Sequence, residues 1–168
     1  MAYCAASPQN VCIGAEMDRF DRKILSLYQH DTRRTAASIG AEVGLSAAAV
    51  QRRLKRLRAE GVIAAEIAVL DGRSVDRPIT CIVSVSLNTG PAQIEKFKRD
   101  MRDEASVQQC YHVTGSTDVM MIVTAKSMEA YGAFARTWFE TPRVARYETH
   151  VVLDRVKAGL SLTLDQED

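Results

Sequence analysis

The stretch TAASIGAEVGLSAAAVQRRLKRLRAEG, from Thr35 to Gly61, has the pattern of two short helices joined by a tight turn. Thr35 and Ser46 are good N-cap residues, because a side-chain hydroxyl can accept a hydrogen bond from a free N–H of the first helical turn. Gly44 interrupts the first apolar pattern, and Gly61 stands where a glycine commonly follows the end of a helix. The sequence therefore predicts a helix on each side of a turn at Gly44.

The second of these helices has two chemically different faces. Val50, Leu54 and Leu57 fall within a narrow sector of a helical wheel, which indicates the face that packs on the preceding helices. Arg52 and Lys55 point the opposite way. We expect the apolar face to be buried and the basic face to be exposed.

The exposed face suits a helix that lies in the major groove of DNA. A small residue such as Ala48 lets the backbone come close, while Gln51 and Arg52 are long enough to reach base edges. Lys55, Arg56 and Arg58 are better placed to neutralise phosphates. The residues that we expect to contact DNA are Ala36, Ser46, Ala47, Ala48, Gln51, Arg52, Lys55 and Arg56.

Charge favours this interpretation over the alternative of a solvated helix in a plain bundle. Between Arg33 and Arg58 the chain has seven basic residues and one acid, Glu42. A solvated helix commonly places Glu and Lys four residues apart, and this helix does not. The net charge of the whole chain is only +1, so the basicity is local. We expect one module to bind DNA and another to do something else.

Length and composition bound the remaining possibilities. The 168 residues allow one large domain or two small ones, and 46% hydrophobic with 26% charged residues is typical of a soluble protein with a core. No stretch approaches the ~18 consecutive apolar residues of a membrane span, and the first residues lack the pattern of a signal peptide. The four cysteines show no C-x-x-C pair and no zinc spacing. We expect a reduced, cytoplasmic protein with no metal, no cofactor and no membrane partner.

The periodicity of the chain divides it into four parts. Residues 1–16 are expected to form a flexible arm, and residues 17–61 a helix-turn-helix DNA-binding domain of three helices. Residues 62–77 are expected to hold a wing strand and a linker, although the apolar first half also fits an extended strap. Residues 78–168 form the fourth part. The expected core of the helical domain is Ile24, Leu27, Ile39, Val43, Leu45, Val50, Leu54 and Leu57.

The fourth part has the order strand, helix, strand, strand, helix, strand. The expected strands are 80–87, 107–114, 118–125 and 144–153, with helices over 92–104 and from 128 up to Pro142. This is the ferredoxin-like α+β arrangement, in which both helices cover one face of an antiparallel sheet. The other face is left for a partner, and a fifth strand is expected over Leu160–Leu164.

Four segments carry a more specific signal. They are MDRFDRKIL (17–25), EVGLSAAAVQRRLKRLRAEGVI (42–63), VTGSTDVMMIV (113–123) and ETHVVLDRVK (148–157). Together these segments resemble the Lrp/AsnC family of bacterial and archaeal transcription regulators, over roughly residues 17–164. The second segment is the most specific of the four. The chain departs from the family at residues 76–78, where Asp-Arg-Pro stands in a region that often has a glycine.

The resemblance implies a winged helix-turn-helix followed by a ferredoxin-like domain that pairs with another copy. Members form homodimers and often tetramers or octamers, and many respond to an amino acid bound between subunits. The residues that the resemblance assigns to the effector site are Thr114, Gly115, Ser116, Thr117 and Asp118 of one loop and Thr149 and Val151 of the last strand.

The chemistry of this loop agrees with that assignment. Gly115 would let a ligand approach the backbone, free N–H groups in a turn suit a carboxylate, and Asp118 can hold an ammonium group. The alternative is a plain hairpin turn in which Asp118 bonds its own backbone. Both can hold for the same loop.

Two other functions fit parts of the sequence. An architectural DNA-binding protein with no effector would share every helix-turn-helix feature, and only a low preference for specific DNA would separate it from a regulator. An enzyme is disfavoured, because His30, His112 and His150 are scattered and no nucleophile–base pattern or phosphate loop appears. In a ferredoxin-like sheet, His112 and His150 would lie on opposite edges. We therefore expect no catalytic residue.

Overall fold

The computed structural model describes residues 17–88 and 90–164. The arm expected over residues 1–16 lies outside the described residues. The described chain forms two compact units, one of residues 17–68 and 158–164 and the other of Val69–Lys157. The last described residues therefore belong to the helical unit, which no local sequence signal indicated.

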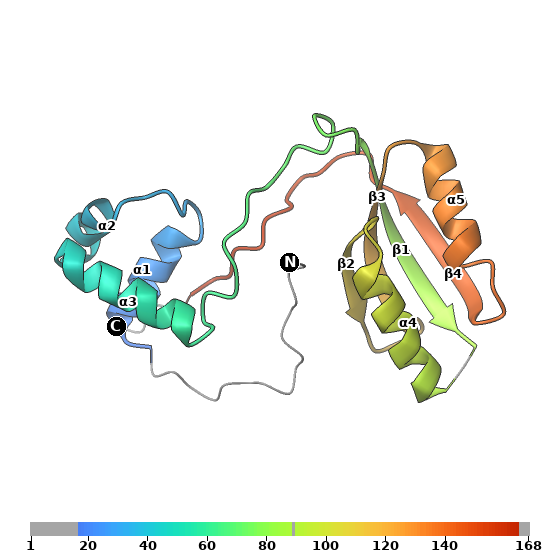
Figure 1. Cartoon of the computed structure of the whole chain (residues 1–168), viewed down its shortest axis with the longest axis horizontal. Coiled ribbons are helices and arrows are strands. Elements are labelled where there is room, and N and C mark those ends of the chain that lie inside the picture. The colour runs from blue at the N-terminus through green and yellow to red at the C-terminus, as the bar shows by residue number, and fades with distance from the viewer. Residues whose placement is uncertain (1–16, 89, 165–168) are drawn as a thin grey trace. The chain divides into compact units, whose positions relative to one another are not determined.

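The first unit contains three helices, α1 Arg19–Tyr28, α2 Ala36–Val43 and α3 Ala47–Ala59 (Figure 1). The expected caps of α2 and α3 are confirmed, since Thr35 and Ser46 accept hydrogen bonds from Ser38 N and Ala49 N. Gly44 ends α2 in the left-handed conformation, with φ of 75°. Because glycine adopts this conformation without a steric cost, α2 can stop here and the chain can turn directly into α3.

The three helices enclose one apolar core. Its buried members are Ile24, Tyr28, Ile39, Val43, Val50 and Leu54, with Leu27 and Leu45 packed against them. Leu57 is also buried. The expected core is confirmed, and Tyr28 joins it with its hydroxyl donating to Glu66 at 2.6 Å.

A buried ion-pair cluster fixes α3 on α1. The carboxylate of Asp21 is fully buried and binds Arg53 at 2.9 Å and Arg56 at 2.5 Å, both from α3. Asp18, the N-cap of α1, binds Arg53 at 2.8 Å and accepts a hydrogen bond from Asp21 N. Burial raises the pKa of Asp18, but the hydrogen bonds from Asp21 N–H and Arg53 outweigh it and hold that pKa below its usual value.

The segment after α3 is extended and has no strand partner. Of the two forms expected for its apolar half, the structure has the strap, because no strand lies between α3 and β1 in the described chain. The strand expected over Leu160–Leu164 was wrong for a similar reason. The backbone N–H and C=O of Leu162 pair with the side-chain amide of Gln29, both at 2.9 Å, and not with a neighbouring strand.

The second unit is the expected ferredoxin-like fold. Its elements are β1 Ile79–Leu87, α4 Pro91–Asp103, β2 Val107–His112, β3 Val119–Ala125, α5 Met128–Trp138 and β4 Val144–Val151 (Figure 1). The strands pair antiparallel in the order β2-β3-β1-β4. His112 and His150 accordingly stand on opposite edge strands, as expected.

Period-two alternation decides which side chains the helices cover. Cys81, Val83 and Val85 of β1 are completely buried, and they form one core with Phe97 of α4 and Phe134 of α5. Both helices therefore lie on the same face of the sheet. Alternate residues such as Ile82 point to the other face, which no element of the described chain covers.

Gly40 tests how tightly the turn between α2 and α3 is packed. A Cβ atom at this position would overlap the carbonyl oxygen of Leu45. Gly40→Ala is expected to lower the free energy of unfolding of the helical unit by about 1–3 kcal/mol, because the turn must move to make room. Urea denaturation followed by circular dichroism measures this change.

Gly132 in α5 provides the matched control, since its added Cβ would meet nothing closer than Arg136 Nη1 at 3.5 Å. Gly132→Ala should leave the stability of its unit unchanged or raise it by about 0.5–1 kcal/mol. Equal effects at the two glycines would contradict the tight turn.

Asp21 tests the ion-pair cluster. Asp21→Asn keeps the shape of the side chain and removes its charge, so two guanidinium groups lose their shared carboxylate. The free energy of unfolding should fall by about 2–3 kcal/mol, the range for hydrogen bonds to a buried charged group. Asp31→Asn is the control, because its partner Arg33 is 90% exposed and should contribute nothing measurable. A stable Asp21→Asn protein would show that the cluster does not hold α3.

Candidate DNA interface and effector loop

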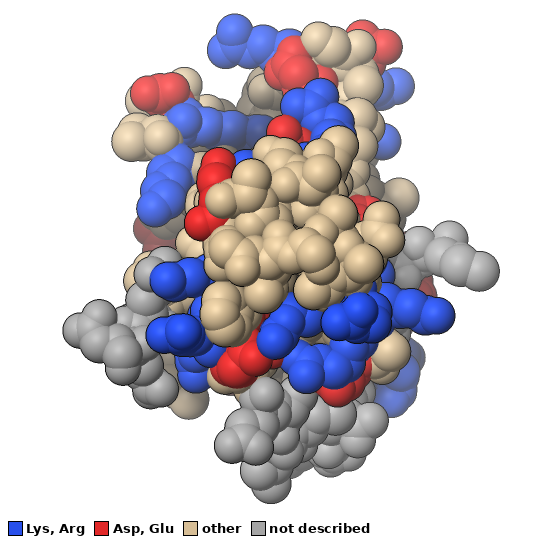
Figure 2. Space-filling model, turned by 90° about the vertical axis from the view of Figure 1, so that its left-hand side faces the viewer, with Lys and Arg blue, Asp and Glu red and all other residues tan. Residues whose placement is uncertain are grey.

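The face of α3 that points away from the core is exposed along its length. Ala48, Gln51, Arg52 and Lys55 are all exposed, as the helical pattern predicts. Figure 2 shows a broad uncharged patch bordered mostly by Lys and Arg side chains, with some Asp and Glu side chains among them. A surface with a neutral centre and a basic border can approach the edges of bases while contacting phosphates on either side.

Ion pairs divide the basic residues from Arg33 to Arg58 into two groups. The paired group is held at 2.5–3.1 Å and consists of Arg33 with Asp31, Arg34 with Glu42, Arg53 and Arg56 with Asp21, and Arg58 with Glu66. Arg52 and Lys55 make no ion pair with any acid of the described chain. The unpaired positive charge of α3 is therefore concentrated on its outward face.

The acids of these pairs mostly lie outside the stretch between Arg33 and Arg58. The local count of basic and acidic residues consequently overstated the charge excess. Glu66 is one such acid, since it lies outside the stretch but pairs with Arg58 inside it. Hydrogen bonds from Tyr28 and Arg58 hold the pKa of Glu66 below its usual value, which keeps this carboxylate charged. What distinguishes α3 is the position of its unpaired cations, and not their number.

Three expected DNA-contacting residues have structural partners. Arg58 is paired with Glu66 at 2.8 Å. The side chain of Arg56 is 44% exposed, and its contact with Asp21 leaves only part of it free for a phosphate. The hydroxyl of Ser46 accepts a hydrogen bond from Ala49 N as the cap of α3. Ala36 is half-buried, whereas Ala47 and Ala48 are exposed at the start of α3.

The loop Thr114–Asp118 joins β2 to β3 and is bonded to the end of β1. Asp118 Oδ2 accepts a hydrogen bond from Leu87 N at 2.7 Å, and Asp118 N donates to Val85 O at 3.0 Å. Thr117 Oγ1 also donates to Val85 O, at 2.9 Å. Gly115 has a φ of 117°, a conformation that side chains disfavour. The loop therefore turns β2 into β3 as expected, but the Asp118 carboxylate bonds the backbone of β1 and not, as the hairpin alternative had it, its own backbone.

The two remaining residues assigned to the effector site lie elsewhere in the sheet. Thr149 and Val151 pair with Val83 and Cys81 of β1, and β1 separates β4 from β3. The hydroxyl of Thr149 lies 2.5 Å from the hydroxyl of Tyr131 in α5. One chain does not bring these residues and the loop around a common cavity. Tyr131 had no sequence signal beyond its apolar helical position, and burial raises its pKa.

Other kinds of site find little support in the described residues. They contain no group of three or more His, Cys, Asp and Glu residues arranged to hold a metal ion. None of the helices over residues 17–88 and 90–164 has the length and apolar character needed to cross a membrane.

Comparison with known proteins gives the family context of this geometry. Residues 17–58 match the AsnC-type helix-turn-helix domain, and residues 80–162 match the Lrp/AsnC ligand binding domain. An HTH-type transcriptional regulator of Sinorhizobium fredii is 43% identical over 89% of this chain and 90% of its own length. The leucine-responsive regulatory protein of Escherichia coli is 30% identical over 90% of this chain and 93% of its own.

Solved structures agree with both domain matches. A transcriptional regulator of Neisseria meningitidis in complex with L-Met superimposes with a TM-score of 0.83 at 29% identity, covering 89% of this chain and 97% of that one. An AsnC family regulator of Agrobacterium tumefaciens has a TM-score of 0.81 at 27% identity, covering 88% and 97%. The chain, with its helix-turn-helix and its ferredoxin-like domain, belongs to the Lrp/AsnC family of DNA-binding transcription regulators.

Proposed function

We propose that the protein is a cytoplasmic regulator that reads specific DNA with α3 and responds to an amino acid bound between two copies of the chain. The observation that carries the DNA-reading part is the pair of unpaired cations, Arg52 and Lys55, on the exposed face of α3. Gln51 and Arg52 read base edges, and Lys55 binds phosphate. Two copies place two such helices in successive major grooves, about one helical turn apart.

Exposed apolar surface supports the assembly of at least a homodimer. The uncovered sheet face carries Ile82, and the extended segments on either side of the sheet domain carry further exposed apolar side chains. The most exposed are Val69 at 90%, Leu153 at 96% and Val156 at 91%. Large apolar side chains left in water favour burial against a partner, and we assign these residues to the contact between copies. Tetramers or octamers would follow from a second contact between dimers.

The chemistry of the loop supports an amino acid as effector. Free N–H groups around Gly115 suit an α-carboxylate, and Asp118 Oδ1 is free to accept an ammonium group while Oδ2 holds Leu87 N. The Neisseria relative was solved with L-Met, and the Escherichia coli relative is named for leucine. In our proposal Thr149 and Val151 of one copy form the wall opposite the loop of another. Coupling between effector and DNA is typically worth about 1–3 kcal/mol.

Substitutions at Arg52 and Lys55 test the division between base reading and phosphate binding. Arg52→Ala should weaken binding to a specific fragment by about 1–3 kcal/mol and random DNA much less, because a base contact is lost. Lys55→Ala should weaken all sequences alike and reduce the salt slope by about one unit. Fluorescence anisotropy at several salt concentrations measures both effects.

Lys96, an exposed lysine of α4, serves as the control, and Lys96→Ala should bind DNA as the unaltered protein does. Equal losses on specific and random DNA for Arg52→Ala would remove this residue from the base-reading set.

Asp118→Asn tests the effector loop. The amide oxygen can still accept the hydrogen bond from Leu87 N, whereas the negative charge that faces an ammonium group is gone. The concentration of amino acid needed to change DNA affinity should rise at least about tenfold, the loss expected for one charge-assisted hydrogen bond. Anisotropy with a panel of amino acids at fixed salt measures the response. Asp103→Asn at the end of α4 is the control, and an unchanged response in Asp118→Asn would place the effector elsewhere.

A further inference from the structure

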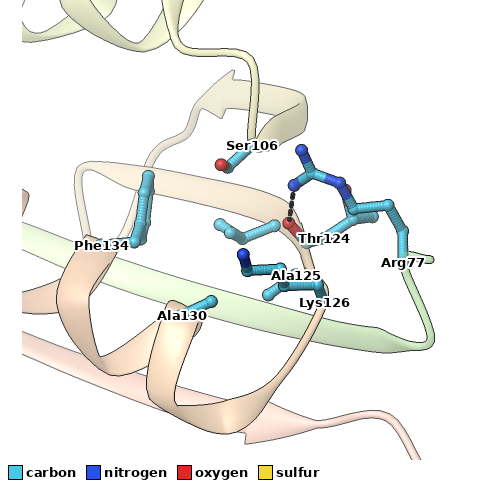
Figure 3. A pocket seen from close by; sticks show the side chains of 8 residues that line it. Arg77, Ser106, Thr124, Ala125, Lys126, Ala130 and Phe134 are labelled. Carbon is cyan, nitrogen blue, oxygen red and sulfur yellow. Dashed lines mark hydrogen bonds between the residues drawn. The ribbon is translucent and has the colours of Figure 1, made fainter.

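The sheet domain carries a small cavity at the end of the sheet opposite the Thr114–Asp118 loop. Its volume is about 170 Å³, and it is lined by Arg77, Ser106, Val123, Thr124, Ala125, Lys126, Ala130 and Phe134 (Figure 3). Ala125 pairs with Ile79 at the start of β1, whereas the loop is bonded to Val85 and Leu87 at the end of β1. At 3.4 Å per residue the two places are about 20 Å apart.

Two positive charges converge on this cavity. Figure 3 shows the guanidinium of Arg77 beside the hydroxyl of Ser106, with the amino nitrogen of Lys126 turned toward the same space. Arg77 is held over the sheet by a hydrogen bond from Nη1 to Thr124 O at 3.3 Å. Neither Arg77 nor Lys126 makes an ion pair with an acid of the described residues. Two neighbouring cations without a counter-charge favour an anion between them.

The backbone before β1 is shaped to present Arg77 at this place. Asp76 has a φ of 57°, which is uncommon for a residue with a side chain, and Arg77 N donates to Gly72 O to close the turn. Pro78 then restricts Arg77 to extended conformations. The turn therefore directs the backbone of Arg77 toward this place, while the side chain itself stays exposed to solvent.

The rest of the lining is apolar. Val123, Ala125 and Phe134 are buried members of the sheet-domain core, and Ala130 is packed against that core. An inorganic anion would leave this wall without a contact, whereas a carboxylate on a short aliphatic body would use both parts of the lining. A closed cavity of about 150 Å³ holds a molecule of six heavy atoms. This one has a similar volume but is partly open to solvent, and an aliphatic body of about four or five carbons matches its apolar wall.

We propose that this cavity is a second ligand site, which binds a small aliphatic carboxylate. Arg77 and Lys126 bind the carboxylate, Ser106 donates a hydrogen bond to it, and Phe134 with Ala130 contacts the aliphatic body. The bound ligand contacts both Arg77, just before β1, and Lys126, between β3 and α5, and so links these two segments. This site does not depend on the effector loop or on the DNA-reading residues.

Saturation-transfer difference NMR with sodium isovalerate tests the site on the full chain, because this method detects weak ligands of large assemblies. The partly solvated cations should give a dissociation constant of about 1 mM. Isovaleramide, a neutral molecule of nearly the same shape, should give no saturable signal. Arg77→Gln and Lys126→Gln should each weaken isovalerate binding about fivefold or more, and Lys96→Gln, an exposed lysine of α4, should not change it.

Four outcomes would overturn the proposal. One is the absence of a saturable isovalerate signal at 10 mM, about ten times the expected dissociation constant. Another is equal binding by isovaleramide or by the Arg77→Gln/Lys126→Gln protein. The third is loss of the signal in Asp118→Asn, which would show that isovalerate binds at the effector loop. Displacement of isovalerate by an equal concentration of inorganic phosphate would likewise exclude a site selective for carboxylates.

Discussion

The buried carboxylate of Asp21 is the contact on which the DNA-reading surface depends. It joins α1 to α3 by binding Arg53 and Arg56, and it thereby fixes both the position and the rotation of α3. The same contact pairs two cations of α3, Arg53 and Arg56, with a carboxylate. Arg52 and Lys55, which lie between and beside the paired residues along the helix, are left facing solvent. The selectivity of the surface follows from which arginines are neutralised.

Most of the fold could be predicted from the sequence, because its signals are local. A hydroxyl at Ser46 and a glycine at Gly44 act within one helical turn, and each has the role that its chemistry predicts. The alternation of apolar and polar residues along β1 is equally local, because successive side chains of one strand point to opposite faces of the sheet. The order of elements then limits the sheet to the ferredoxin-like arrangement. The expected core of the helical unit follows from the same periodicities.

The features that could not be predicted join residues distant in the chain. Nothing near Asp21 indicates that two arginines more than thirty positions away will neutralise it. The side-chain amide of Gln29 takes both backbone hydrogen bonds of Leu162. The alternating apolar segment around Leu162 therefore does not pair as a strand. Thr149, which the resemblance assigned to the effector site, is hydrogen-bonded to Tyr131 of α5. An effector site shared between copies also needs a second chain, which one sequence cannot position.

The most direct test of the central claim is the affinity of the protein for DNA upstream of its own gene, a common target in this family. Fluorescence anisotropy would compare this fragment with a shuffled fragment of equal composition at one salt concentration. A base-reading α3 predicts a preference of about 10³ or more for the native fragment. Equal binding to the two fragments would favour an architectural protein or a target at another locus. Failure to bind either fragment at low salt would contradict the assignment of α3 as the DNA-reading helix.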